Sequence, residues 1–206
     1  MPTTFYLRST FSGIGGAGDR YLSQRSGRSP ASTAITTTVA GGTNITVTAT
    51  AGGQALQWFT EPITAAITIS GTVTVNIRGL ESANTVNAGR GILIQRTDIF
   101  GVVQSTILAD STVPATITEF TTTDAANGAA TYTPTSTAMA VGERIKVTLK
   151  VRNVGTMAAG TVTISYNGSA SGASGDTYVR FTEDIRTDES IEVPSFEIYG
   201  SNGYTG

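Results

Sequence analysis

The sequence contains no histidine and no cysteine. Without cysteine the chain can form neither a disulfide bond nor a thiolate metal site, and its redox compartment cannot be inferred. Without histidine it cannot use a Ser-His-Asp or Cys-His mechanism, nor bind zinc or iron through imidazole. Because the usual side chains of catalysis are missing, we expect that the protein is not an enzyme.

Carboxylate chemistry is the one catalytic class that the composition leaves open. A glycosidase needs two carboxyl groups about 5–10 Å apart across a groove. Glu183 and Asp184 are adjacent, so a strand would direct their side chains to opposite faces. Six further acidic residues lie in different segments, and the sequence does not say whether any two converge: Glu61, Glu81, Asp98, Asp110, Glu119 and Asp124.

Charged residues and long apolar runs are also scarce. Charged residues make up 14% of the chain, the formal net charge is -2, and the lysines are Lys146 and Lys150 alone. A nucleic-acid-binding protein carries a strongly basic stripe, so we expect no nucleic-acid partner. No apolar run approaches the roughly 18 residues of a membrane span, and the first residues lack the apolar core of a secretory signal. We therefore expect no membrane partner and synthesis in the cytoplasm.

The few charges are unevenly distributed. Residues 1–33 carry four arginines against one aspartate, whereas residues 176–206 carry seven acidic residues against two arginines. Oppositely charged ends of this kind are typical of interaction tails, and they can meet within one subunit or between neighbours. The alternative is that both ends are simply solvated.

What the sequence has in abundance is threonine in alternation. From Ile63 to Gly79 the odd positions are apolar or glycine, and the even positions are mostly Thr, Ser, Asn or Arg. A period of two indicates a strand with one face on a core and one in water. Similar short segments follow, separated by turns such as Gly41-Gly42 and Asn167-Gly168. The pattern predicts an all-β chain that forms an antiparallel, jelly-roll-like β-sandwich.

The predicted organisation has three parts. Residues 1–33 are expected to form an N-terminal arm or long loop with one short strand, because Ser12 to Ser32 is rich in Gly, Ser and Arg. Residues 34–185 are expected to form the β-sandwich domain. Residues 186–206 are an acidic C-terminal extension.

Three details of the sandwich follow from the sequence. Gly71 falls in phase with the apolar positions of the long run, which suits a bend or a bulge. Residues 143–153 and 161–167 both alternate, and we expect them to pair as a hairpin whose outer face carries the lysines. Trp58 is the single tryptophan and is expected to anchor the core, although a ligand-stacking platform is the alternative.

Two local patterns are compatible with ligands but have simpler explanations. The run from Gly13 to Gly18 matches the dinucleotide-binding fingerprint, yet Gly27 and Pro30 follow where a helix should hold the pyrophosphate. Asp124 and Asn127 share a loop that offers oxygen ligands to calcium, but a solvated turn is the simpler interpretation. We therefore expect no cofactor and no metal site.

Several segments of strand-and-turn pattern together resemble a known family. They are Phe5 to Arg8 before a glycine-rich loop, Gln57 to Pro62, Ile67 to Val73, Ala140 to Val147, and Gly175 to Glu183. In this order they are similar to a domain found among tailed-bacteriophage virion structural proteins. The resemblance covers most of residues 3–185 and implies a β-sandwich assembled in many copies on a head, neck or tail, with no catalytic residues to carry over. The extension from residue 186 onward has no counterpart in that pattern.

This resemblance implies a structural protein of the phage virion, and the first hypothesis is a homo-oligomeric capsid decoration or cement subunit. A tail or neck component of the same particle is the alternative, and a glycan-binding β-sandwich module is the second alternative. The expected partners are copies of the chain itself and other virion proteins, either the major capsid protein or tail and neck proteins. The side chains expected to make assembly contacts are Arg20, Arg25 and Arg28 toward acidic partners, and Phe196, Tyr199 and Tyr204 as apolar anchors.

Overall fold

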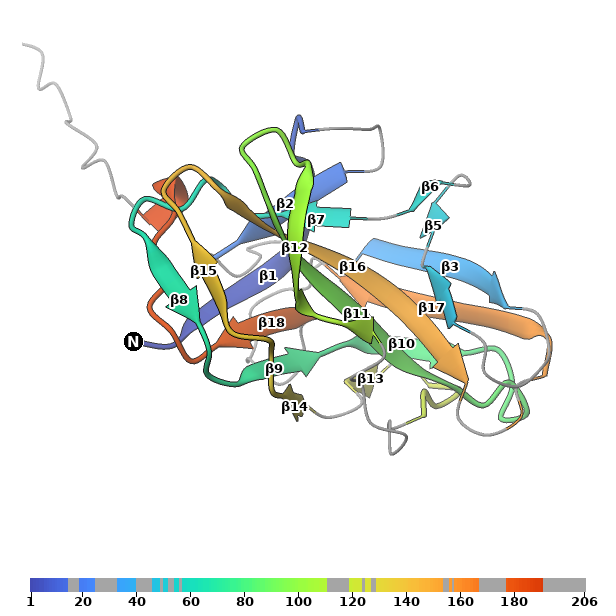
Figure 1. Cartoon of the computed structure of the whole chain (residues 1–206). Coiled ribbons are helices and arrows are strands. Elements are labelled where there is room, and N and C mark those ends of the chain that lie inside the picture. Colours follow the sequence, from blue (N-terminus) through green and yellow to red (C-terminus); the bar gives the residue numbers. More distant parts are fainter. Residues whose placement is uncertain are drawn as a thin grey trace, which may run out of the picture.

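The structure of the chain is a computed structural model (Figure 1). It describes residues 1–14, 19–24, 33–39, 46–48, 50–51, 54–55, 57–110, 119–123, 125–126, 129–153, 156, 158–166 and 177–190. The described elements are strands and one short 3-10 helix, η2 (Asp188–Ser190), which confirms the predicted all-β class. Within the described residues, no helix has the length and apolar character needed to cross a membrane.

Most strands belong to two sheets. The large sheet follows the order β12 (Val103–Leu108), β11 (Ala88–Thr97), β16 (Arg144–Asn153), β7 (Gln57–Phe59), β2 (Asp19–Ser23), β1 (Thr3–Phe11), β18 (Tyr178–Phe181), β9 (Val73–Asn76) and β14 (Ala130–Tyr132), with β4 (Thr46–Thr48) also paired to β16. The second sheet follows the order β13 (Ala125–Ala126), β10 (Arg78–Glu81), β17 (Gly160–Tyr166) and β3 (Thr33–Val39). Two small sheets pair β15 (Thr137–Met139) with β8 (Ile67–Ile69), and β5 (Thr50–Ala51) with β6 (Gln54–Ala55).

The pairing is antiparallel with one exception among the described strands. β2 runs parallel to β7, with Arg20 beside Trp58. The prediction of an antiparallel sandwich is therefore corrected at this one pair. Its finer part, the jelly-roll topology, stays a prediction. Figure 1 shows β8 and β15 together at one end of the molecule and β3 and β17 at the other.

The core forms where the apolar faces of the alternating strands meet. On β16 every second side chain, from Ile145 to Val151, is fully buried, while Lys146 and Lys150 between them are only partly buried. On β17 the same period of two buries Val162, Ile164 and Tyr166. Burial of one face of each strand follows directly from the alternation of the sequence.

The hairpin predicted from residues 143–153 and 161–167 is wrong. β16 pairs with β11 and β7 in the large sheet, whereas β17 pairs with β10 and β3 in the second sheet. Two strands with equal apolar periods can bury those faces side by side in one sheet or on opposite sides of a core. Periodicity does not distinguish these arrangements, because both leave the same residues buried.

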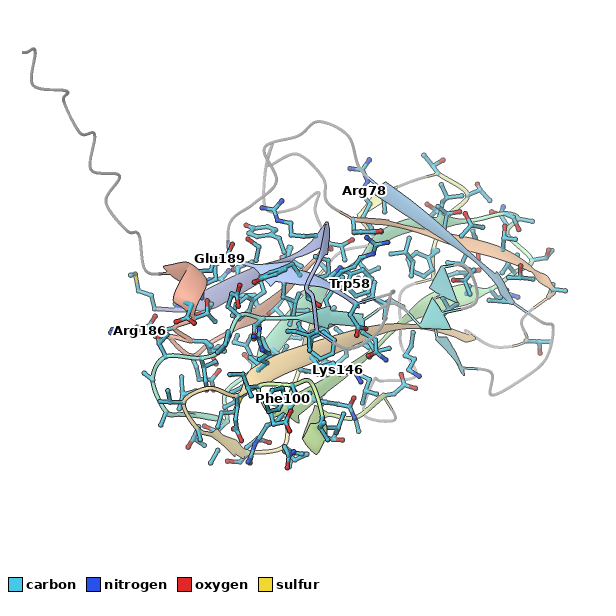
Figure 2. All side chains as sticks on the ribbon, turned by 90° about the horizontal axis from the view of Figure 1, so that it is seen from above. Trp58, Arg78, Phe100, Lys146, Arg186 and Glu189 are labelled. Atoms are coloured by element: carbon cyan, nitrogen blue, oxygen red, sulfur yellow. The ribbon has the colours of Figure 1, made fainter. Side chains whose placement is uncertain are left out.

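Trp58 joins three parts of the core. Its indole ring lies edge-on to the ring of Tyr166 with a centroid distance of 5.4 Å, so a residue of β7 contacts a residue of β17 in the other sheet. Its Nε1 donates a hydrogen bond to the carbonyl oxygen of Arg8 on β1 at 2.9 Å. Trp58 is fully buried, near the middle of the molecule in Figure 2, which confirms the predicted role as a core anchor.

The long alternating run bends at Gly71 as predicted. It divides into β8, β9 and β10, which belong to three different sheets. At the bend, the backbone N–H groups of Ser70 and Gly71 donate to the carboxylate of Glu183 at 2.8 and 2.5 Å. Burial opposes the charged form of this carboxylate, but the hydrogen bonds from Gly71 and Ser70 outweigh it and lower the pKa of Glu183.

The N-terminal arm predicted for residues 1–33 needs correction. β1 lies inside the large sheet between β2 and β18, and Phe5, Leu7 and Leu22 are buried in the core. Apolar side chains at alternate positions of β1 allow it to join the sheet despite the glycine-rich segment that follows. Residues 3–11 and 19–23 therefore belong to the large sheet, and residues 15–18 and 25–32 lie outside the described part.

The described residues near the C-terminus run back across the N-terminal strands, and we call residues 182–190 the C-terminal strap. The hydroxyl of Thr3 donates to the carbonyl of Glu183 at 3.0 Å, and Gln24 N donates to the carboxylate of Glu189 at 2.9 Å. Glu189 also accepts a hydrogen bond from Ser23, and the terminal amino group lies 3.9 Å from Asp184. The described parts of the two oppositely charged ends thus meet within one subunit (Figure 2).

Candidate interaction surface

The exposed large apolar side chains of the described residues gather at one place. Apart from Met1, all five lie in the turn after β11, in the first residue of β12, or in the turn before β16. Phe100 is 79% exposed and Val141 is 63% exposed. We call this group the apolar tip, and it consists of Ile99, Phe100, Val102, Val103 and Val141.

The two turns of the apolar tip are brought together by the pairing of β11 with β16. Thr97, the last residue of β11, lies opposite Arg144, the first residue of β16. Arg144 Nε donates to the carbonyl of Ile99 at 3.1 Å, and Arg96 Nη1 donates to the carbonyl of Ala138 at 3.0 Å. Arg144 therefore ties the turn after β11 to β16, and Arg96 ties β11 to β15 (Thr137–Met139), the strand before the other turn.

The turn from Asp98 to Val102 is held in one conformation by its own hydrogen bonds. One carboxylate oxygen of Asp98 accepts the backbone N–H groups of Phe100 and Val102, both at 2.9 Å. Gly101 supplies the positive φ of 86° that the turn requires. The exposed ring of Phe100 is therefore carried by a preorganised loop, which reduces the entropy lost when a partner binds.

The turn also rests on the outer face of the large sheet. A Cβ atom placed on Gly101 would lie 2.8 Å from Ile14 and 3.2 Å from the ring of Phe59. Lys146 Nζ lies 5.9 Å from the centroid of the same Phe59 ring. Figure 2 shows Phe100 and Lys146 over this part of the sheet. Burial lowers the pKa of Lys146, so the apolar tip continues into a partly desolvated surface.

The apolar tip adjoins an open sheet edge. β12 is an edge strand of the large sheet. Near its C-terminal end, the carbonyl of Ile107 accepts a hydrogen bond from Thr135 N at 2.7 Å. Within the described residues, no strand pairs with the outer edge of residues 103–106. Residues 99–109 contain no charged residue and no proline. Natural sheets commonly protect such edges with lysine or proline, and this edge lacks both devices.

The charged residues around the apolar tip neutralise one another. Arg96 forms an ion pair with Glu143 at 2.7 Å, and Arg144 forms one with Glu61 at 3.3 Å. The carboxylate of Asp98 is engaged by the turn itself. The surface therefore presents an apolar centre with a rim of paired charges, which suits a neutral partner better than a strongly charged one.

The side chains predicted to make assembly contacts are not those of the apolar tip. Arg20 is half-buried, and its guanidinium lies 5.9 Å from the ring centroid of the buried Tyr166, so it packs on a core ring, and its assembly role stays a prediction. The other five lie outside the described residues and stay predictions: Arg25, Arg28, Phe196, Tyr199 and Tyr204. Asp124 and Asn127, which were considered as a calcium-binding loop, also lie outside the described residues.

Two of the scattered carboxyl groups do converge. Glu81 is 2% exposed, its carboxylate accepts the backbone N–H of Ala88 at 3.1 Å, and its side chain shares a hydrogen bond with Glu119. A hydrogen bond between two carboxyl groups requires that one of them carries a proton. Burial is the largest influence and raises the pKa of Glu81. The hydrogen bond from Ala88 N–H lowers it, and the charge and hydrogen bond of Glu119 raise it again, so the net shift is upward.

The carboxyl pair predicts a pH-dependent effect on stability. Because the pKa of Glu81 is raised by folding, its favourable contribution is complete below the ordinary value of 4.5 and is lost as pH rises through the folded value. Glu81→Gln keeps a hydrogen-bond donor at every pH and should therefore raise the Tm at neutral pH, with a smaller difference below pH 4.5. Thermal unfolding followed by circular dichroism at both pH values checks this.

Glu183→Gln is the matched control for that prediction, because the pKa of Glu183 is lowered. A lowered pKa contributes stability above the unfolded value, and the contribution is lost as pH falls through the folded value. Glu183→Gln should therefore lower the Tm at neutral pH and matter less in acid. If both variants changed the Tm in the same direction at neutral pH, the assignment of the two carboxyl groups would be wrong.

Comparisons with known proteins give structural matches without sequence matches. No protein-family model and no curated protein matches the chain. An aminopeptidase from a marine sediment Thaumarchaeota archaeon is similar with a TM-score of 0.55 and 12% identity over 91% of this chain and 37% of that chain. A CocE/NonD family hydrolase from Staphylococcus aureus has a TM-score of 0.48 and 11% identity over 91% and 36%. An alpha-amino acid ester hydrolase has a TM-score of 0.44 and 12% identity over 89% and 36%. The chain thus spans little more than a third of these proteins.

The likeness to the archaeal aminopeptidase contradicts the expectation that the protein is not an enzyme, because that protein is a hydrolase. At 12% identity the likeness to the aminopeptidase shows the fold alone, so neither a substrate nor a catalytic residue is transferred to this chain. The expectation was drawn from the side chains that the chain lacks, and those do not decide which proteins share its fold.

Proposed function

We propose that the chain is a structural subunit of a tailed-phage virion that acts by protein–protein assembly, with capsid decoration as its first assignment. The observation that supports this most is the apolar tip, where a preorganised turn presents Phe100 with 79% exposure. Exposed apolar side chains scattered singly need no explanation, but a contiguous group marks an interaction site. The resemblance of the strand-and-turn segments to virion proteins supports a phage particle as the place of assembly.

The mode of assembly follows from the chemistry of this surface. The rim charges are paired, and residues 99–109 are uncharged, so apolar burial and backbone hydrogen bonds would supply the affinity. A weak contact of this kind becomes effective when many copies are held on one particle, because each further contact is then made at high effective concentration. Attachment by this route depends little on salt.

The two alternatives, a tail or neck component and a glycan-binding module, are not equally supported. A tail or neck component would use the same apolar tip, so only its location in the particle separates it from a decoration subunit. A glycan-binding module needs exposed aromatic platforms, and Trp58 is fully buried against Tyr166. The burial of the single tryptophan counts against the glycan-binding alternative.

Mass spectrometry of purified phage particles tests the proposal. The chain should be present at a fixed ratio to the major capsid protein after extensive washing in high salt, and antibody labelling in electron micrographs should place it on the head. Labelling of the neck or tail would favour the alternative station. Absence of the chain from washed particles would refute the virion assignment altogether.

The structural comparisons favour a second candidate, which is the β-sandwich part of a hydrolase. The specific observation is that 91% of this chain matches 37% of the archaeal aminopeptidase. Purified chain should be assayed with p-nitrophenyl esters and with amino-acid p-nitroanilides. Turnover that follows the protein through purification would favour this candidate over the virion assignment.

A further inference from the structure

We propose that the partner of the apolar tip is a second copy of this chain, bound edge to edge through antiparallel pairing of β12 with β12 about a two-fold axis. The inference rests on the proposed function, since a subunit present in many copies meets itself first. It names a partner and a geometry that the proposed function leaves open.

The distribution of exposed apolar groups favours a second copy. In the described part of the chain, Met1 is the one large exposed apolar residue outside the apolar tip. A contact between two copies therefore buries most apolar surface when the tip of one meets the tip of the other. Such a contact is self-complementary, which is the requirement for an interface around a two-fold axis.

The open edge of β12 suits pairing with itself. Two-fold antiparallel pairing places only the residues at the axis opposite their own symmetry mates, so a charge near the axis would face a like charge and destabilise the pair. Residues 99–109 carry no charge, and residues 103–106 have no strand partner among the described elements. Main-chain donors and acceptors on both copies would then satisfy one another, as in β-augmentation.

The other sheet edges are less suited to this role. β14, at the opposite end of the large sheet, has three residues. β3, at the end of the second sheet, is also uncharged, but no exposed large apolar residue adjoins it among the described residues. Of these three edges, only that of β12 combines a strand longer than three residues with exposed large apolar side chains beside it in the described part.

The paired charges at the rim argue against a strongly charged partner. Arg96 and Arg144 are neutralised by Glu143 and Glu61 and also hold backbone carbonyls at this end of the sheet. An acidic or basic partner would therefore find no unpaired counter-charge among these four side chains. A second copy, with the same apolar centre and neutral rim, avoids this mismatch.

Single-cysteine cross-linking tests the pairing directly, because the natural chain has no cysteine to compete. Near the axis of an antiparallel pair, Cα atoms of symmetry mates lie about 4.5–5.5 Å apart, which is within disulfide range. Val103→Cys or Gln104→Cys should give a disulfide-linked dimer under mild oxidation of the full chain. Asn84→Cys, in the exposed loop between β10 and β11 at the far end of β11, is the control and should stay monomeric.

Charge pairing at Val103 provides a second test that does not depend on oxidation. Val103→Lys and Val103→Glu should each be monomeric in sedimentation velocity, with circular dichroism like that of the natural chain, while their mixture should form a heterodimer. A natural chain that stays monomeric at every concentration, or a dimer that neither substitution weakens, would overturn the inference. Equal cross-linking through Asn84→Cys would do the same.

The two proposals can fail separately. A chain that is found in washed particles but neither dimerises nor cross-links through β12 would keep the virion assignment and lose the two-fold pairing. A chain that forms the β12 dimer but is absent from particles would keep the pairing and lose the virion assignment.

Discussion

Replacing Trp58 with alanine is expected to lower the free energy of unfolding by about 3–5 kcal/mol, the usual cost of removing a fully buried aromatic side chain. The effect should lie in the upper part of that range because the indole ring contacts Tyr166 in the second sheet and its Nε1 bonds to Arg8 on β1. Urea unfolding followed by circular dichroism measures this, since the variant has no tryptophan fluorescence.

Trp58→Phe separates packing from hydrogen bonding at the same site. Phenylalanine keeps an aromatic ring against Tyr166 but leaves the carbonyl of Arg8 without the indole donor, so a loss of about 1–3 kcal/mol is expected. A loss below about 1 kcal/mol for Trp58→Ala would show that this residue does not join the two sheets.

Phe100→Asp is expected to abolish self-association and attachment to the particle while it leaves the fold intact. The ring is 79% exposed, so its removal should change the free energy of unfolding by no more than about 0.5 kcal/mol. A carboxylate at the centre of the apolar tip would have to be desolvated in any contact, which is costly without a counter-charge. Sedimentation velocity, thermal unfolding and binding to purified particles measure the three effects.

Asn84→Asp is the matched control for Phe100→Asp. It adds the same charge in an exposed loop at the opposite end of β11 and should leave both association and stability unchanged. Association that survives Phe100→Asp, or that is lost equally in Asn84→Asp, would mean that the apolar tip is not the contact surface.

Local features of the fold were predictable from the sequence because they depend on neighbouring residues. The alternation of apolar residues and threonine predicts strands and names the buried face, as β16 shows with Ile145 to Val151. Gly71, in phase with apolar positions, predicts the bend between β8 and β9. The size and apolar character of Trp58 predict a core position.

Pairing between strands was not predictable in the same way, because it joins residues far apart in the sequence. β1 lies beside β18, with Thr3 opposite Phe181, so the end of the chain decides whether its beginning is an arm or a strand. β16 and β17 follow one another but lie in different sheets. Alternation fixes which face of a strand is apolar and leaves its neighbours open.

The candidate surface was not predicted from the sequence, because charge and aromatic content both point to the terminal segments. The signal that could have found it is an apolar run, Ile99 to Val103, around a glycine between two alternating segments, where polar residues are usual. The carboxyl pair could not be found this way, since Glu81 and Glu119 meet only through the crossing of β10, β11 and the segment near Phe120.

Hydrogen–deuterium exchange tests most directly whether the apolar tip is where this protein assembles. The natural chain should be compared as a dilute monomer and in its associated state, with exchange followed peptide by peptide. Exchange should slow in residues 98–106 and 140–143 on association and stay unchanged in the buried strand β16, which is protected in both states. Unchanged exchange in residues 98–106, with new protection over the C-terminal strap or β3 instead, would contradict this expectation.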